Sequence, residues 1–220
     1  MIYTENIFVC LAAPLVIASF LLKGGARRFT GFFALGLTAC LLSAYVNSFF
    51  VAALIDNGRA SLTMAEAIMR VTPVCEEVMK ALPVFLFMAL AEPRRGDLIP
   101  VAFAVGLGFA TFENCCYITQ YGAGDFLFAL VRGFSAGVMH TICAAILAYG
   151  LAHIHGRDRL VMPCAFALLC ASSTFHSIYN IMSASYGAWL TIGYMMPLVT
   201  AAAIVLWPKY SIVIFKSNDN

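Results

Sequence analysis

Two adjacent carboxylates inside an apolar segment are the residues of this sequence best placed to do chemistry. Glu76 and Glu77, followed by Lys80, lie within residues 65–91, which are otherwise mainly apolar. A charged side chain near the centre of a bilayer costs roughly 2.5–3.5 kcal/mol on insertion scales. Two adjacent carboxylates also repel each other. A membrane helix that carries such a pair is by default a candidate functional site.

The composition places this pair in a membrane protein. Hydrophobic residues make up 62% of the chain and charged residues 11%, against about 25% charged residues in soluble domains. The net charge of +2 gives no indication of nucleic-acid binding. The eight cysteines lie mostly in apolar runs without a CxxC pair, so we interpret them as buried, reduced side chains. We expect an integral membrane protein that contacts the lipid bilayer.

Seven apolar segments are long enough to span a bilayer, which takes about 20 residues. They predict an all-α, polytopic membrane helix bundle that forms a single domain, residues 1–220, with the catalytic helices at about 65–183. A capping box, Thr63 to Glu66, predicts the start of the third helix. Pro73 and Pro83 predict a bend or a local break in it. The predicted spans are 3–22, 30–55, 65–91, 98–121, 126–152, 160–183 and 187–207.

The basic residues predict the orientation of these spans. Nine Lys and Arg residues fall on one side of the predicted membrane, whereas the opposite side has only Arg59. The positive-inside rule then places the N-terminus outside and the C-terminus inside. The bases Lys23, Arg27 and Arg28 follow the first span instead of preceding it, so we interpret that span as uncleaved. We expect a multi-pass protein of the cell membrane.

Further polar residues occur in the next three predicted spans. Glu113 lies in 98–121, His140 in 126–152, and His176 and Asn180 in 160–183. At a helical rise of about 1.5 Å per residue, Glu76, Glu113 and the two histidines lie roughly 11–21 Å from the outer ends of their spans. Polar groups that face lipid are expensive. We therefore expect these side chains to meet in one bundle, between the outer interface and the midplane.

Simple structural roles compete with this interpretation. A Glu–Lys pair four residues apart, such as Glu76 and Lys80, can tether helices. A single histidine at a helix interface is more often a packing residue than a ligand. Arg132 can extend its charge toward the outer surface. The shared depth on four consecutive helices favours a functional site, because independent packing residues have no reason to share one depth.

Two kinds of hydrolytic chemistry fit the set. His140, His176 and Glu113 have the ligand types of a catalytic zinc site with an open position for water, and Glu76 or Glu77 would be the general base. The chain has no HExxH motif, so separate helices would have to assemble the site. In a metal-free version, a Glu–His pair activates water, and His176 with Asn180 stabilises the oxyanion.

The polar residues resemble the motifs of the PrsW family of intramembrane proteases. Glu76-Glu77-Val-Met-Lys80 is similar to its EExxK motif, and Phe112-Glu113-Asn-Cys-Cys-Tyr117 to its FExxxY motif. His140 and the segment from His176 to Asn180 resemble its two histidine motifs. The motifs occur in family order over residues 73–180. The family is distantly related to the CAAX prenyl endopeptidases.

The resemblance implies a multi-pass protease that cleaves a membrane-anchored protein toward the outer side of the membrane. It implies zinc as the cofactor, or glutamate and histidine acting without a firmly bound metal. The substrate would be an anti-sigma factor, as in the best-known members. One alternative is a proton- or cation-coupled transporter that uses the buried carboxylates as a relay, although the inner halves of these spans are nearly free of ionisable groups. Another is a structural protein whose charges hold helices together.

Overall fold

The structure is a computed structural model, and it describes residues 4–56, 63–91, 93–121, 126–154 and 158–206. These residues form helices without strands, which confirms the predicted all-α fold. Each predicted span coincides with one helix. The largest difference is at α2, which begins at Gly24 instead of residue 30. The helices are α1 (Thr4–Leu21), α2 (Gly24–Asp56), α3 (Met64–Ala91), α4 (Arg95–Tyr121), α5 (Phe126–Ile154), α6 (Asp158–Ser183) and α7 (Ala188–Leu206).

Five of the described helices, α2, α4, α5, α6 and α7, are long and apolar enough to cross a membrane. With these spans the chain is a multi-pass membrane protein. The helices α1 and α3 are not among the five, and α3 carries Glu76, Glu77 and Lys80 within its apolar stretch. These three charged residues mark the candidate site, and they also make α3 more charged than the five apolar spans.

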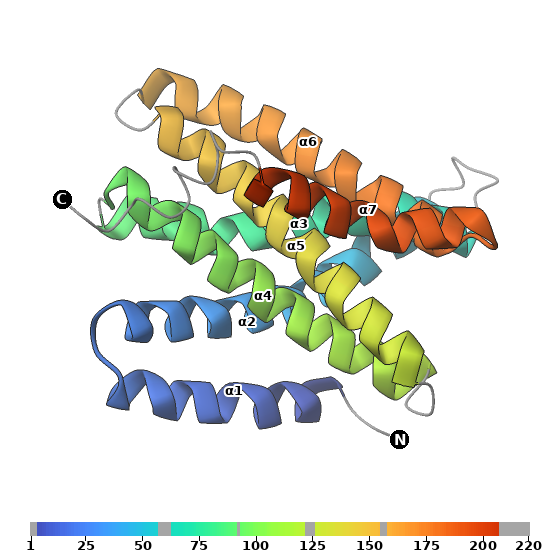
Figure 1. The fold of residues 1–220 in the computed structure, drawn as a ribbon, viewed down its shortest axis with the longest axis horizontal. Helices are drawn as coiled ribbons and strands as arrows, with labels where there is room; N and C mark the ends of the chain where they lie inside the picture. Colours follow the sequence, from blue (N-terminus) through green and yellow to red (C-terminus); the bar gives the residue numbers. More distant parts are fainter. Residues whose placement is uncertain (1–3, 57–62, 92, 122–125, 155–157, 207–220) are drawn as a thin grey trace.

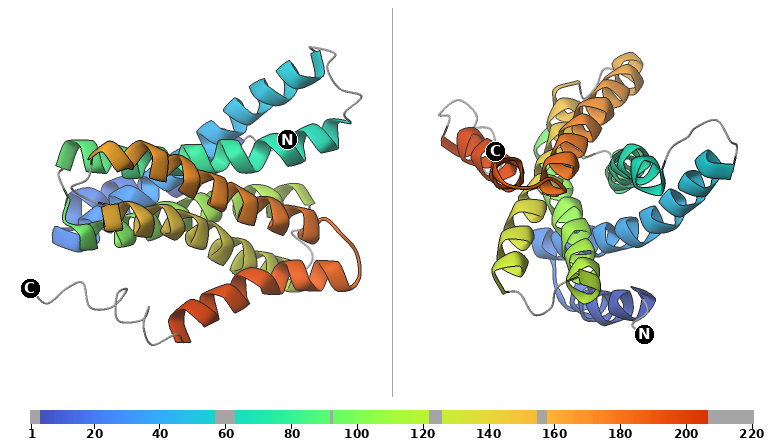
Figure 2. Two further views of the ribbon diagram at one scale, coloured as in Figure 1. Left: turned by 90° about the horizontal axis from the view of Figure 1, so that it is seen from above. Right: turned by 90° about the vertical axis from the view of Figure 1, so that its right-hand side faces the viewer.

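Four helices cover one face of α3, and its opposite face exposes Val74, Val78 and Leu82. In Figure 1, α4 and α5 run diagonally through the centre of the molecule, with α1 and α2 on one side and α6 and α7 on the other. The helix α3 packs against α2, α4, α5 and α6. Figure 2 shows α3 between α2 and α6 when the molecule is viewed end-on. A charged helix in this position can turn its polar side chains toward protein instead of lipid.

The helix α3 begins at the predicted capping box. The Thr63 backbone N–H donates to Glu66 Oε2 at 2.8 Å, and the Glu66 N–H donates to Thr63 Oγ1 at 3.3 Å. The helix then runs unbroken through Pro73 and Pro83, so the predicted possibility of a local break is wrong. Each proline removes one backbone donor, and packing against four neighbouring helices keeps the segment helical.

Glycines bring α2 and α4 into close contact. A Cβ atom at Gly36 would collide with the backbone of Val105, and a Cβ atom at Gly108 would collide with the backbone of Phe33. Small residues at such a crossing allow two membrane helices to approach closely. The position of α4 relative to α2 therefore depends on the absence of side chains at these two positions.

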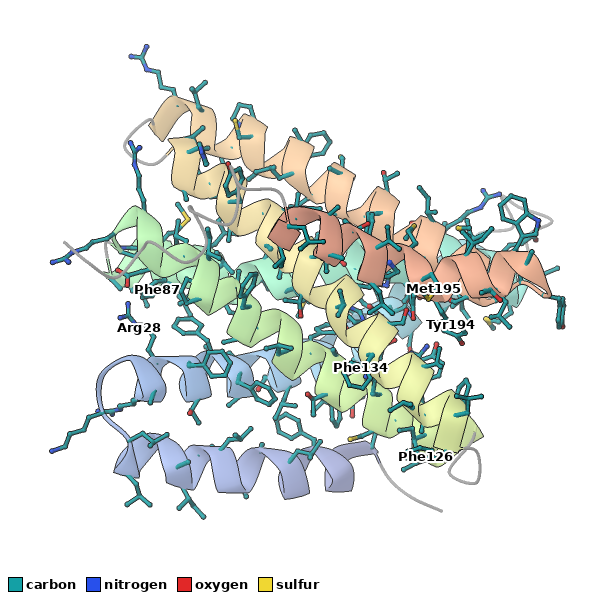
Figure 3. The ribbon with its side chains drawn as sticks, in the orientation of Figure 1. Arg28, Phe87, Phe126, Phe134, Tyr194 and Met195 are labelled. Carbon is teal, nitrogen blue, oxygen red and sulfur yellow. The ribbon has the colours of Figure 1, made fainter. Side chains whose placement is uncertain are left out.

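An ion pair joins the helix ends on the side predicted to face the cytoplasm. Arg28 Nη1, near the start of α2, lies 2.7 Å from Asp97 Oδ1 at the start of α4. The guanidinium carbon of Arg28 lies 6.0 Å from the centre of the Phe87 ring, near the end of α3, and Figure 3 shows the two side chains together. Both partners of the ion pair are partly exposed, so we expect it to contribute at most about 1 kcal/mol.

Candidate active site

Polar side chains from four helices meet in the interior of the bundle. They come from α3, α4, α5 and α6, the four helices that the sequence predicts to be catalytic. All are buried except Glu113, whose side chain is 17% exposed. The cluster consists of Glu76, Glu77, Lys80, Glu113, Arg132, His140 and His176.

Lys80 links the glutamate pair to the histidine of α5. Its Nζ atom donates to Glu77 Oε1 at 2.6 Å and lies 2.9 Å from His140 Nδ1. The same atom lies 4.9 Å from the centre of the Phe109 ring. The partner of Lys80 on its own helix is thus Glu77, three residues away, whereas the sequence suggested Glu76, four residues away. An ammonium group has three protons to donate, and two of them point to these partners.

His176 lies between the two adjacent glutamates. Its Nδ1 atom is 2.7 Å from Glu77 Oε1, and its Nε2 atom is 3.6 Å from Glu76 Oε2. Because an ionised carboxylate only accepts hydrogen bonds, a neutral His176 donates its Nδ1 proton to Glu77. The lone pair of Nε2 then faces Glu76 Oε2, a buried atom that has no hydrogen-bond partner among the described residues. Two electron-rich atoms that face each other in this way need a proton or a cation between them.

Glu113 connects α4 to α5 through both of its oxygens. Oε2 makes a short hydrogen bond with His140 Nε2, and Oε1 accepts a hydrogen bond from Arg132 Nη2 at 3.1 Å. The guanidinium carbon of Arg132 also lies 3.4 Å from the centre of the Tyr117 ring. Arg132 is only 8% exposed, which contradicts the competing interpretation that it extends its charge to the outer surface. The Glu113 carboxylate attracts the guanidinium inward, where the two charges pair.

The formal charges of the cluster do not cancel. Three carboxylates, Glu76, Glu77 and Glu113, face two cations, Lys80 and Arg132, and neutral histidines leave one negative charge. An uncompensated charge in a buried site is costly. Either a divalent cation with a bound hydroxide or a single extra proton would neutralise the cluster.

The ligand atoms that fit a metal ion come from Glu76, His140 and His176, and all three lie within 4.8 Å of one another. Two ligands about 2.05 Å from a tetrahedral zinc are roughly 3.4 Å apart, close to the 3.6 Å between Glu76 Oε2 and His176 Nε2. Glu77 accepts the other ring proton of His176, as the outer partners of metal-bound histidines do. The donor set therefore fits a metal, with Glu76 in the position that the sequence suggested for Glu113.

His140 is the least available of these three ligands, because both of its ring nitrogens already have partners. Its Nδ1 atom lies against Lys80, and its Nε2 atom is bonded to Glu113. If the Lys80 ammonium donates to Nδ1, then Nε2 carries the proton and donates it to Glu113. His140 would bind a metal through Nε2 only after releasing Glu113.

Asn180 is the one predicted site residue whose side chain the structure does not connect to the cluster. It is half-buried one turn after His176. Its backbone carbonyl accepts hydrogen bonds from the Ala184 N–H at 3.0 Å and the Ser183 hydroxyl at 3.2 Å. Its role in oxyanion stabilisation stays a prediction.

Lys80 and Arg132 are members of the cluster that the predicted catalytic and metal-binding sets left out. The available signal was their charge, since a cation within a membrane span needs a partner. Each of the two forms an ion pair with a predicted carboxylate, Lys80 with Glu77 and Arg132 with Glu113. Charge alone would have selected both residues, but together with Arg70, which the structure leaves exposed on α3.

A multi-pass helical protein that buries paired glutamates beside two histidines has the parts of an intramembrane hydrolase. The chain belongs to the PrsW family: the model of the PrsW family intramembrane metalloproteases matches residues 25–207, from the start of α2 to the end of α7. This match confirms the family inferred from the four motifs and makes the protein a membrane-embedded protease. Neither the curated proteins nor the solved structures gave a match.

Proposed function

We propose that the protein is an endopeptidase that uses a zinc centre to cleave a membrane-anchored protein toward the outer side of the cell membrane. Glu76, His176 and His140 would hold the metal, and Glu113 would act as general base. The observation that carries this proposal is the pair of facing lone-pair atoms, Glu76 Oε2 and His176 Nε2, 3.6 Å apart and buried. Zinc bound there would lower the pKa of its water to around 7.

Glu113 suits proton transfer better than either adjacent glutamate. Its side chain is 17% exposed, against 11% for Glu76 and 2% for Glu77, so it is the most accessible of the three carboxylates. Glu77 Oε1 accepts from Lys80 and from His176, a proposed metal ligand, so we assign Glu77 to orienting that ligand. Glu113 would take a proton from the attacking water and give it to the leaving amine. This proposal exchanges the roles that the sequence suggested for Glu76 and Glu113.

The bonds of His140 favour a metal-free version as a second candidate. Both ring nitrogens already have partners, Lys80 and Glu113. A proton shared between Glu76 and His176 would then neutralise the cluster in place of a metal ion. In this version Glu113 takes a proton from the attacking water, the proton shared by Glu76 and His176 passes to the leaving amine, and the proton on Glu113 then restores the shared one.

The predicted orientation supports cleavage toward the outer side. The nine bases predicted on the inner side place the predicted site residues in the outer half of the membrane. The family implies a protein substrate within the membrane. We propose a membrane-anchored protein as that substrate, with an anti-sigma factor as the first candidate to test.

Metal removal tests the zinc version directly. The protein would be purified in detergent, its zinc content measured, and its cleavage of single-span reporter proteins followed before chelation, after chelation and after zinc is returned. We expect about one zinc per chain, with activity that disappears and returns together with the metal. Glu76→Gln should lower both zinc content and cleavage, whereas Glu66→Gln, at the exposed start of α3, should lower neither. Cleavage that survives complete metal removal would refute the zinc version and support the metal-free one.

A further inference from the structure

Arg132 and Tyr117 lie on the outer side of the Glu113–His140 pair in the predicted orientation, and they contact each other. Tyr117 follows Glu113 by four residues on α4, so both side chains lie on one face of that helix. Arg132 reaches this face from α5. Its guanidinium donates to Glu113 Oε1 at 3.1 Å while its central carbon lies 3.4 Å from the centre of the Tyr117 ring.

The contact with Arg132 restricts the orientation of the Glu113 carboxylate. A carboxylate bonded only to His140 could rotate about its terminal torsion, because such torsions have broad energy wells. With Oε1 held by Arg132, Oε2 stays directed at His140. After His140 releases Oε2 to bind a metal, the bond from Arg132 to Oε1 would still hold the carboxylate in this orientation before substrate binds, and such preorganisation lowers a reaction barrier.

The tyrosine ring holds the arginine in turn. A guanidinium is planar and weakly hydrated, so it stacks on aromatic rings in a way that a lysine ammonium cannot reproduce. Tyr117 is 38% exposed, whereas Arg132 is 8% exposed. The ring thus lies on the more exposed side of the buried ion pair and limits the contact of the guanidinium with solvent and lipid.

We propose that Arg132 and Tyr117 are positioning residues that fix the Glu113 carboxylate for proton transfer. Arg132 holds one carboxylate oxygen, and Tyr117 holds the guanidinium in the plane that this contact requires. The inference rests on the proposed role of Glu113, and it assigns a task to the tyrosine of the FExxxY motif and to an arginine outside the four motifs.

Two pairs of variants separate positioning from simple charge balance. Arg132→Lys keeps the charge but loses the planar stack, and Arg132→Met loses both. Tyr117→Phe keeps the ring, and Tyr117→Leu removes it. With a reporter protein as substrate, we expect kcat to fall about 100-fold for Arg132→Met and roughly tenfold for Arg132→Lys and Tyr117→Leu. Tyr117→Phe should retain most of the kcat, and KM should change little in every case.

Matched controls measure the nonspecific cost of each change. Phe134→Leu removes a ring from an exposed position on α5 (Figure 3), and Arg70→Gln removes an exposed arginine from α3. Both should cleave at the rate of the unsubstituted protein. Kinetic constants would be normalised to the folded fraction, measured by thermal unfolding in detergent, so that a loss of folded protein is not counted as a loss of kcat.

The outcomes also separate this inference from the proposed function. If Glu113→Gln abolishes cleavage but Arg132→Lys and Tyr117→Leu leave kcat per folded molecule unchanged, the positioning role is wrong and the role of Glu113 stands. If Glu113→Gln itself leaves cleavage intact, the proposed base is wrong, and the positioning role fails with it. Equal losses for Tyr117→Phe and Tyr117→Leu would also contradict the role of the ring.

Discussion

Three glutamates of the site have the same side chain but different partners. Glu77 contacts Lys80 and His176, and Glu113 contacts Arg132 and His140. Glu76 Oε2 has no hydrogen-bond partner among the described residues. Because removing one partner of a buried ion pair leaves the other charge uncompensated, the three carboxylates should respond differently to substitution by glutamine.

Glu77→Gln should reduce both stability and activity. It takes the negative charge away from the Lys80 ammonium, a change that typically costs about 3–5 kcal/mol in a buried pair. Glu76→Gln should abolish cleavage with little loss of stability, since Oε2 has no hydrogen bond to lose. Unfolding in detergent and reporter cleavage, measured on both variants, check this contrast. Equal destabilisation by the two substitutions would show that Glu76 has a structural partner.

At the residue scale, the sequence predicts the members of the site better than their pairing. Glu76, Glu77, Glu113, His140 and His176 all lie in the cluster. The choice of Glu77 over Glu76 as the partner of Lys80 depends on the rotation of α3 against its neighbours and on side-chain rotamers. Neither can be obtained from a spacing of three or four residues, because both spacings place side chains on nearly the same face.

At the element scale, the contact between α2 and α4 determines where Glu113 lies. Gly108 lies five residues before Glu113 on α4, and it contacts the backbone of Phe33 on α2. The interior of a packed bundle does not accommodate even one extra methyl group without displacement. A change at this crossing should therefore be transmitted along α4 to the carboxylate.

Gly108→Ala should separate α2 from α4, because the added methyl group would collide with the Phe33 carbonyl. We expect a destabilisation of about 1–3 kcal/mol, together with a lower kcat. Gly137→Ala on α5 is the matched control, because a Cβ atom there has no neighbour within 4 Å. The control should be neutral or stabilising by up to about 1 kcal/mol. Thermal unfolding and reporter cleavage of both variants would test this prediction. If Gly108→Ala changed neither stability nor kcat, the close crossing of α2 and α4 would be contradicted.

The helix ends were largely predictable because apolar runs mark them directly. The start of α3 was predictable from the Thr63–Glu66 capping box, which forms as expected. The continuity of α3 through Pro73 and Pro83 was not predictable. Whether a proline breaks a helix depends on how firmly neighbouring helices hold the segment, and that packing involves residues far away in the sequence.

At the scale of the whole molecule, the orientation in the membrane is a prediction that labelling can check. Tyr186, between α6 and α7, is predicted to face outward, and Arg94, just before α4, to face inward. In a variant whose native cysteines are replaced by alanine, Tyr186→Cys should react with a membrane-impermeant maleimide added to intact cells. Arg94→Cys should react only after the membrane is opened. The reverse pattern would place the site in the inner half of the membrane and contradict outer-side cleavage.

The packing of later helices against the polar face of α3 has a consequence for the synthesis of the protein. The ribosome makes α3 before α5 and α6, which supply His140 and His176. Until then, Lys80 can pair with Glu77 within α3, but Glu76 has no histidine to face. We therefore expect α3 to remain beside the insertion machinery until α6 has emerged. We expect a nascent chain that ends before α6 to be inactive, because it lacks His176, so membrane proteins nearby are not cut during the synthesis of α1 to α5.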